Sequence, residues 1–214
     1  LLFAGAASHY RVQALRQVGG FDAHNLAPDS GLSMRFARFG FRTALVPTLT
    51  RGEAPCRLSD WLSQRVRNIK GTLQTALVNS RTPLRMWRDL GPRNFLITQA
   101  LTGGAIINAL LHPFFLAWIV TAFTLEAVGR PMAGRLWLFL LALYGLVAIF
   151  AGLAAFASSI RASLFLGRGF SWGVTLLTLP AYWLMISIAT WVAVVQFFAR
   201  KRRWTKTAHG VSRI

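Results

Sequence analysis

The sequence predicts an α/β segment followed by an all-α transmembrane region, and two observations lead to this division. Residues 1–93 hold 14 Lys and Arg and 5 Asp and Glu, whereas residues 94–214 hold 10 Lys and Arg and a single acid, Glu126. Hydrophobic residues make up 54% of the 214 residues, a high share for a soluble protein. We therefore expect a polar domain over 1–93, transmembrane helices within 94–199 and a basic tail over 200–214.

The first residues indicate a strand and then a helix. Leu1 to Ala7 is short, small and apolar, as the end of a buried strand would be. Val12 to Val18 is a helical run, and Gly19-Gly20 closes it. The chain begins without Met or a basic run, which does not fit a signal peptide. We therefore expect the strand to belong to a domain that starts before Leu1.

A second helix is predicted to begin at Asp29. Asp is a common N-cap residue, Leu32, Phe36 and Phe39 follow at helical spacing, and Gly40 is a stop signal. A carboxylate at a helix start is half-exposed and close to the positive end of the helix dipole. There it can accept a proton from a bound hydroxyl group. The alternative interpretation is that Asp29 only caps the helix.

The next elements are a predicted strand and a third helix. Phe41 to Val46 is rich in β-forming residues, and Pro47 ends the run. After a loop, Ser59 or Asp60 is expected to start a helix. Its apolar face is predicted to consist of Leu62, Val66, Ile69 and Leu73, and another face of Gln64, Arg67, Gly71 and Gln74.

This third helix has two interpretations. Gln64 and Arg67 are three residues apart, so they can present an amide and a guanidinium to one ligand. A guanidinium is well shaped to pair two phosphate oxygens. A basic amphipathic helix is also typical of a plain anchor at a membrane interface.

Three apolar segments follow, at about 94–126, 136–158 and 171–198. Each is longer than the ~20 residues that span a bilayer, and their interiors hold no charge other than the titratable His112. His112 precedes Pro113, so it could relay protons or could simply bind a carbonyl freed by the proline. Three simple crossings would separate the basic tail from the basic third helix, against the positive-inside tendency. We therefore expect the first segment to bend at Pro113, re-entrant or as a hairpin, with the tail in the cytosol.

Composition also excludes some classes of function. The net charge is +18, but the basic residues flank apolar segments instead of forming a compact aromatic surface. This favours anionic membrane lipids as partners and no nucleic acid. The lone Cys56 cannot form an internal disulfide, and the four His residues show no zinc-site spacing.

Several motifs occur in a fixed order along nearly the whole chain. They are Ser8-His9-Tyr10-Arg11, Gly19-Gly20-Phe21-Asp22, the Asp29 segment, Gln64-Arg65-Val66-Arg67-Asn68 and Trp204-Thr205-Lys206-Thr207-Ala208-His209-Gly210. In this order they resemble the processive, membrane-bound family-2 glycosyltransferases, the group of cellulose and hyaluronan synthases, in their bacterial form.

The resemblance implies a fold, a reaction and a set of site residues. Residues 1–93 would be the acceptor-side half of an α/β GT-A-type domain in a bacterial inner-membrane protein, with its N-terminal part and tail cytosolic. The enzyme would transfer a sugar, with inversion, from a nucleotide diphosphate sugar to a growing glycan. Asp29 would be the catalytic base. The substrate-binding residues would be His9, Tyr10 and Arg11 on the acceptor side and Gln64, Arg65, Arg67 and Asn68 around the diphosphate and acceptor.

Two positions depart from the family's pattern. Ala27-Pro28-Asp29 stands where the family usually has Thr-Glu-Asp, and Asn68 stands where it has the Trp of Gln-x-x-Arg-Trp. The sequence also lacks the Asp-x-Asp motif that would hold Mg²⁺ or Mn²⁺. We therefore expect a fragment or truncated form without the donor-binding half, and no metal ligands within this chain. The alternative is a non-catalytic membrane subunit or pseudoenzyme of a glycan synthesis or secretion complex. A membrane-anchored basic protein would explain the charge but not the ordered motifs.

Overall fold

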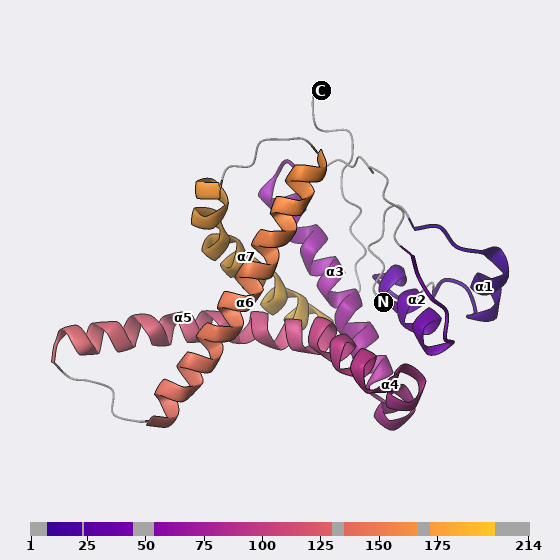
Figure 1. Cartoon of the computed structure of the whole chain (residues 1–214), viewed down its shortest axis with the longest axis horizontal. Coiled ribbons are helices and arrows are strands. Elements are labelled where there is room, and N and C mark those ends of the chain that lie inside the picture. Colours follow the sequence, from indigo (N-terminus) through magenta and orange to yellow (C-terminus); the bar gives the residue numbers. More distant parts are fainter. Residues whose placement is uncertain (1–7, 23, 45–53, 130–134, 167–171, 200–214) are drawn as a thin grey trace. The chain divides into compact units, whose positions relative to one another are not determined.

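The computed structural model describes residues 8–22, 24–44, 54–129, 135–166 and 172–199, and the elements among them are helical (Figure 1). In chain order they are α1 (Val12–Gln17), α2 (Pro28–Arg38), α3 (Leu58–Asn79), α4 (Pro83–Gln99), the π-helix η2 (Ala100–Gly104), α5 (Ala105–Ala127), α6 (Arg135–Leu166) and α7 (Trp172–Phe198). The chain divides into two compact units. One comprises Leu1–Asn108 with Ile188–Ile214, and the other Ala109–Ser187.

The predicted α/β fold class is wrong for the part of the chain that the structure describes. No strand occurs within the described ranges, and Phe41 to Ala44 follow α2 without regular structure. The Phe41 amide donates to the Phe36 carbonyl at 3.0 Å, so it belongs to the end of a helix and to no strand ladder. A β-rich run needs a pairing strand to satisfy its backbone groups, and none lies beside this one among the described residues. The calls at Leu1 to Ala7 and at Leu45 to Pro47 lie outside the described residues.

Both N-terminal helices end as their glycines predict. At the end of α2 the Gly40 amide donates to the Ala37 carbonyl at 3.1 Å, and Gly40 has a φ of 78°. Together with the Phe41–Phe36 bond this is a Schellman motif, and the Phe36 and Phe41 rings pack edge to face at 5.4 Å. Gly19, with a φ of 83°, ends α1 in the same way. Local glycine signals therefore fix where these helices stop.

Helix α2 is the centre of the first unit. Leu32 and Phe36 pack with Val18 on the side of α1, and Met34 packs with Met86 and Leu90 of α4. A third cluster joins α3 to the last turns of α7, through Val66, Ala189 and Ala193, with Leu62 and Ile69 beside it. The predicted apolar face of α3 is therefore confirmed at three positions, and its partner is an apolar helix.

The long helical stretch from Pro83 onwards is not uniform. Gly91 has φ 72° and ψ 165°, which breaks α4 just before Pro92. Helix α5 begins after η2 and continues through Pro113 as one helix. A hairpin at Pro113 is therefore wrong, because the helix is interrupted at Gly91, where glycine tolerates a positive φ, and not at the proline.

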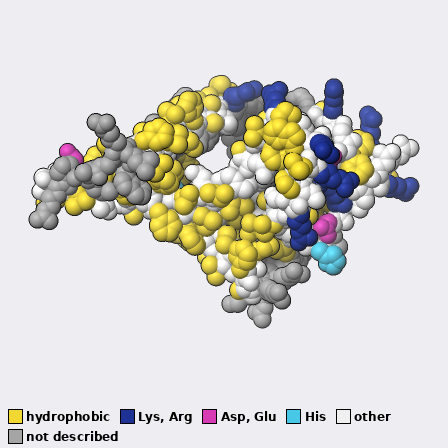
Figure 2. Space-filling model, turned by 90° about the horizontal axis from the view of Figure 1, so that it is seen from below, with side chains coloured by type: hydrophobic (Ala, Val, Ile, Leu, Met, Phe, Trp, Pro, Cys, Tyr) yellow, Lys and Arg dark blue, Asp and Glu magenta, His cyan; other side chains and the backbone are white. Residues whose placement is uncertain are grey.

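Among the residues that the structure describes, three helices are long and apolar enough to cross a membrane: Pro83–Ala127, Leu138–Ser158 and Leu177–Phe198. They correspond to the three predicted apolar segments, although the first begins earlier. Apolar side chains cover much of the surface seen in Figure 2. Phe139 and Phe150 of α6 are 63% and 65% exposed, which suits a lipid environment.

In the second unit, His112 lies among aromatic residues. Its Nδ1 is hydrogen-bonded to the Tyr144 hydroxyl, and its ring packs edge to face on Trp183 at 5.8 Å. Phe115 stacks on Tyr144 with ring centres 4.0 Å apart. The imidazole is thus bound by a hydroxyl of α6, and not by a carbonyl freed at Pro113. The proton-relay interpretation of His112 stays a prediction.

Candidate functional site

Asp29, the proposed catalytic base, lies in the first turn of α2. Ala27 is the N-cap residue and forms no side-chain cap bond, so the expectation that Asp29 itself caps the helix is wrong by two positions. Pro28 occupies the first turn, where its fixed φ and missing amide hydrogen are tolerated. The Asp29 side chain is half-buried, and its backbone carbonyl accepts a hydrogen bond from Ser33 Oγ at 2.8 Å. The carboxylate is therefore available to a ligand near a positive helix end.

The turn before Asp29 packs directly against α3. A Cβ added to Gly71 would lie 2.2 Å from the Cβ of Ala27 and 2.4 Å from its backbone nitrogen. Asn25 Nδ2 donates to Thr75 Oγ1 at 3.1 Å, and Gln74 Nε2 donates to the His24 carbonyl at 3.2 Å. Asn25 also accepts a bond from the Ala27 amide at 3.0 Å, which shapes the turn. Backbone contact at a buried glycine thus fixes where α2 begins.

Gly71 belongs to the predicted polar stripe of α3. Gln64, Arg67, Gly71 and Gln74 recur at intervals of three and four residues, so they share one side of the helix. Ala27 contacts this stripe at Gly71, and Arg67 is one turn away along it. The side chains of Gln64 and Arg67 are both half-buried. The structure therefore brings the Asp29 turn and this stripe to the same part of the first unit.

Arg65 and Asn68 are placed differently. The Arg65 guanidinium lies over the Trp61 ring, 5.6 Å from its centre. Its buried Nε has no hydrogen-bond partner within the described residues. Asn68 is exposed, and its carbonyl accepts a bond from Thr72 Oγ1 at 3.1 Å. Position 68 therefore has no aromatic ring, although the family pattern has one there. The nearby indole of Trp61 is already in contact with the Arg65 guanidinium.

The three acceptor-side candidates lie near the other end of α2. Tyr10 stacks on Phe36 at 5.6 Å and contacts Phe21 edge to face at 5.8 Å. His9 is exposed, and Arg11 is the exposed N-cap residue of α1. Phe36 is about 10 Å along the helix axis from Asp29. The ring of Tyr10 thus belongs to the core, and the structure does not group these three residues with the Asp29 turn.

Sequence reasoning missed Lys70, which is only 6% exposed. Its ammonium donates to Gln196 Oε1 of α7 at 2.5 Å. Removal of the ammonium from water lowers the pKa of Lys70 below its ordinary value. A signal was present, because Lys70 follows Val66 by four residues on an otherwise apolar side of α3.

The residues that the structure describes include no cluster of His, Cys, Asp and Glu suited to a metal ion. Mg²⁺ and Mn²⁺ prefer several oxygen ligands, and Asp29 has no second carboxylate beside it in such a cluster. The described residues therefore do not fit the divalent cation that the family resemblance implies.

The comparisons with known proteins agree with the ordered motifs. The model of the family described as "Glycosyl transferase family group 2" matches residues 1–200. No curated protein and no solved structure gave a significant match. Since the match covers nearly all of the chain, this protein belongs to glycosyl transferase family group 2.

Proposed function

We propose that this chain acts in a membrane glycosyltransferase of the processive type, which transfers a sugar from a nucleotide diphosphate sugar to a growing glycan with inversion. Asp29 takes the proton from the attacking acceptor hydroxyl. Gln64 and Arg67 hold the diphosphate and the acceptor, with Arg65 and Asn68 at the edge of the site. His9, Tyr10 and Arg11 act farther out on the acceptor side.

The observation that supports this proposal best is the contact of Ala27 with Gly71. It sets a half-buried carboxylate and a half-buried guanidinium on neighbouring parts of two packed helices. A base and a phosphate-binding cation are the two groups that such a transfer requires on either side of the reacting bond. A helix cap alone would not require the close approach of two backbones.

The donor sugar's diphosphate also needs charge neutralisation by Mg²⁺ or Mn²⁺ in this proposal. No Asp-x-Asp motif occurs in the sequence, so we assign no ligand and no step to the metal in these residues. We expect the 214 residues expressed alone to transfer no sugar. Robust transfer by these residues alone would contradict that expectation.

We also propose that the protein is a multi-pass protein of a bacterial inner membrane, with residues 1–93 and the basic tail in the cytosol. The positive-inside tendency supports this orientation, because basic residues are frequent before Asn94 and again from Arg200 onwards. A reporter that is active only outside the cytosol, fused after Ile214, should stay silent. An active reporter would favour three simple crossings.

The test of the catalytic proposal compares two first-turn carboxylates. Membranes containing the product of the whole gene are assayed for transfer from a panel of radiolabelled nucleotide sugars. Asp29→Asn should lower turnover by roughly 10²–10⁴-fold with donor binding little changed. Arg67→Ala should weaken donor binding as well. Asp60→Asn is the control, because Asp60 also lies in the first turn of a helix.

Wild-type turnover in the Asp29→Asn protein would mean that Asp29 serves only the helix. A second candidate function is a non-catalytic subunit of a glycan synthesis or secretion complex, and the exposed Asn68 and the Pro28 of α2 favour it. If the wild-type protein transfers no sugar from any donor, while its deletion stops glycan output in cells, this second candidate is correct.

A further inference from the structure

The first turns of α4, Pro83 to Leu90, have two sides with different neighbours. Met86 and Leu90 are buried against Met34 of α2. On the outer side, Leu84 is 76% exposed and Trp87 is 42% exposed. This segment therefore exposes a large apolar residue and part of an indole at the start of Pro83–Ala127, a helical stretch that is apolar enough to cross a membrane.

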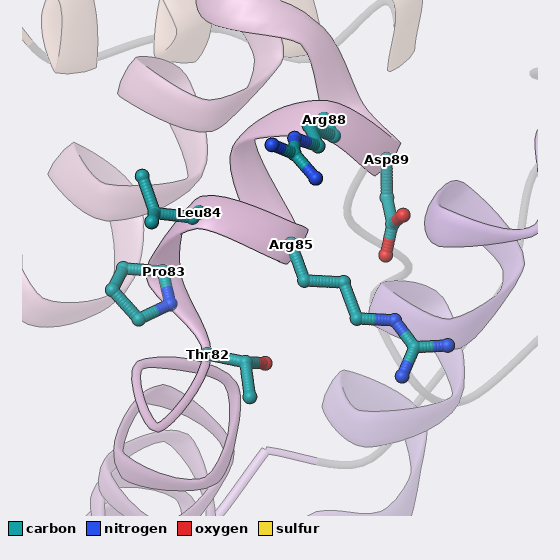
Figure 3. Close-up of a pocket in the computed structure, with 6 residues that line it drawn as sticks. All are labelled: Thr82, Pro83, Leu84, Arg85, Arg88 and Asp89. Atoms are coloured by element: carbon teal, nitrogen blue, oxygen red, sulfur yellow. The ribbon is translucent and has the colours of Figure 1, made fainter.

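Two arginines of this segment line an open hollow of about 530 Å³. In Figure 3 the Arg85 side chain extends on the side of Asp89, away from Leu84. The lining residues are Thr82, Pro83, Leu84, Arg85, Arg88 and Asp89. Both arginine side chains are exposed. Asp89, the one acid in the hollow, forms an ion pair with Arg38 at 2.8 Å, so its charge is directed towards α2. The hollow therefore has net positive charge.

The position of the hollow points to the bilayer. Gly91 breaks the helix, and after Arg93 no acidic or basic residue other than His112 occurs before Glu126. Arg88 and Arg85 precede Arg93 by five and eight residues, on the other side of the break at Gly91. Trp87 packs on Phe95, the second residue of the uncharged stretch, with ring centres 5.1 Å apart. Indoles are enriched at the level of lipid headgroups.

We propose that the outer side of Pro83 to Leu90 is a binding site for an anionic phospholipid. The phosphate is bound by the guanidinium groups of Arg85 and Arg88, and the first methylenes of the acyl chains lie against Trp87, which packs on Phe95. Charge decides between lipid classes, because a zwitterionic headgroup brings its own cation to the phosphate. The proposal rests on membrane insertion and is independent of the chemistry of Asp29.

This hollow is separate from the candidate catalytic site. Arg38, which binds Asp89, lies about 13 Å along α2 from Asp29. An alternative occupant for two arginines is the diphosphate of a nucleotide, so the experiment includes that competitor.

The test uses the full chain in lipid vesicles with one fluorophore near the hollow. Leu84→Cys in a Cys56→Ser background is labelled with bimane, since Cys56 is the single cysteine. Quenching is measured with phosphatidylglycerol or phosphatidylcholine that carries a nitroxide on carbon 5 of the acyl chain. Anionic lipid should associate about 30-fold more strongly, the factor for two charges of roughly 1 kcal/mol each. Salt at 0.5 M should reduce this preference.

The decisive variant is Arg85→Gln with Arg88→Gln. It should lower the ratio of phosphatidylglycerol association to phosphatidylcholine association to a value close to 1. The matched control is Arg16→Gln with Arg42→Gln, which removes the same charge from two exposed positions of α1 and the segment after α2 and should keep the preference. Far-UV circular dichroism checks that each variant is folded. Equal quenching by both lipids, or a preference that survives the decisive variant, would overturn the proposal. Displacement of the lipid by uridine diphosphate at millimolar concentration would overturn it in favour of a nucleotide site.

Discussion

Helices α3 and α6 are both long, and they differ in what surrounds them. Helix α3 packs through one apolar side on α7 and through Gly71 on the turn before α2, and it buries a lysine. Helix α6 presents large apolar side chains such as Leu138, Phe139 and Phe150 with more than half of their surface exposed. Protein contacts determine the position of the first helix, whereas the exposed apolar side chains of the second suit a lipid solvent. The substitutions below test this difference.

The largest effect is expected from charges placed in α6. Leu143→Asp with Val147→Asp puts two carboxylates in the middle of an apolar span, on positions that are exposed. Each should cost about 2.5–3.5 kcal/mol of insertion free energy. Carbonate extraction is applied to a fusion whose single apolar segment is Arg135–Leu166. It should leave the wild-type segment in the pellet and release a large part of the variant. Equal retention of both would mean that α6 does not face lipid.

A smaller effect is expected at the contact between α2 and α3. Gly71→Ala places a methyl group 2.2 Å from the Ala27 Cβ, so one backbone has to move. Overpacking of this kind costs about 1–3 kcal/mol, partly offset by about 1 kcal/mol from better helix propensity. Thermal unfolding in detergent, followed by tryptophan emission, should show a lower midpoint.

The control for that substitution is Gly145→Ala in α6, because nothing lies within 4 Å of a Cβ added there. It should leave the midpoint unchanged or raise it. If both variants behave alike, the close approach of Ala27 and Gly71 does not exist in the protein.

The smallest effect is a pH dependence at Lys70. Burial lowers its pKa in the folded state below the ordinary value of 10.5, so the unfolded state binds more protons. Stability should therefore rise as the pH increases from the folded pKa towards 10.5, and this rise should be weaker in Lys70→Met. Midpoints measured between pH 7 and pH 10 test it.

The sequence predicted the features of this chain that depend on neighbouring residues. Gly19 and Gly40 could be recognised as helix ends because a positive φ at glycine depends only on the adjacent residues. The candidate membrane spans could be recognised because the length and low polarity of a segment are enough to identify them. The predicted strand at Phe41 failed because a strand depends on a partner elsewhere in the chain. The contact of Ala27 with Gly71 joins residues 44 positions apart, and no local pattern encodes it. Asp29 and the polar stripe of α3 could each be named from the sequence, but the contact that brings them together could not.

The proposed site depends most on the contact between the Asp29 turn and the polar stripe of α3. Asn25→Cys with Thr75→Cys, in a Cys56→Ser background, places thiols where Asn25 Nδ2 and Thr75 Oγ1 are 3.1 Å apart. A short bifunctional thiol reagent, applied to membranes, should cross-link this pair. The pair Asn25→Cys with Asn68→Cys should stay open, because Asn68 is about 10 Å farther along α3. Failure of the first pair to react, or equal reaction of both pairs, would contradict the central claim.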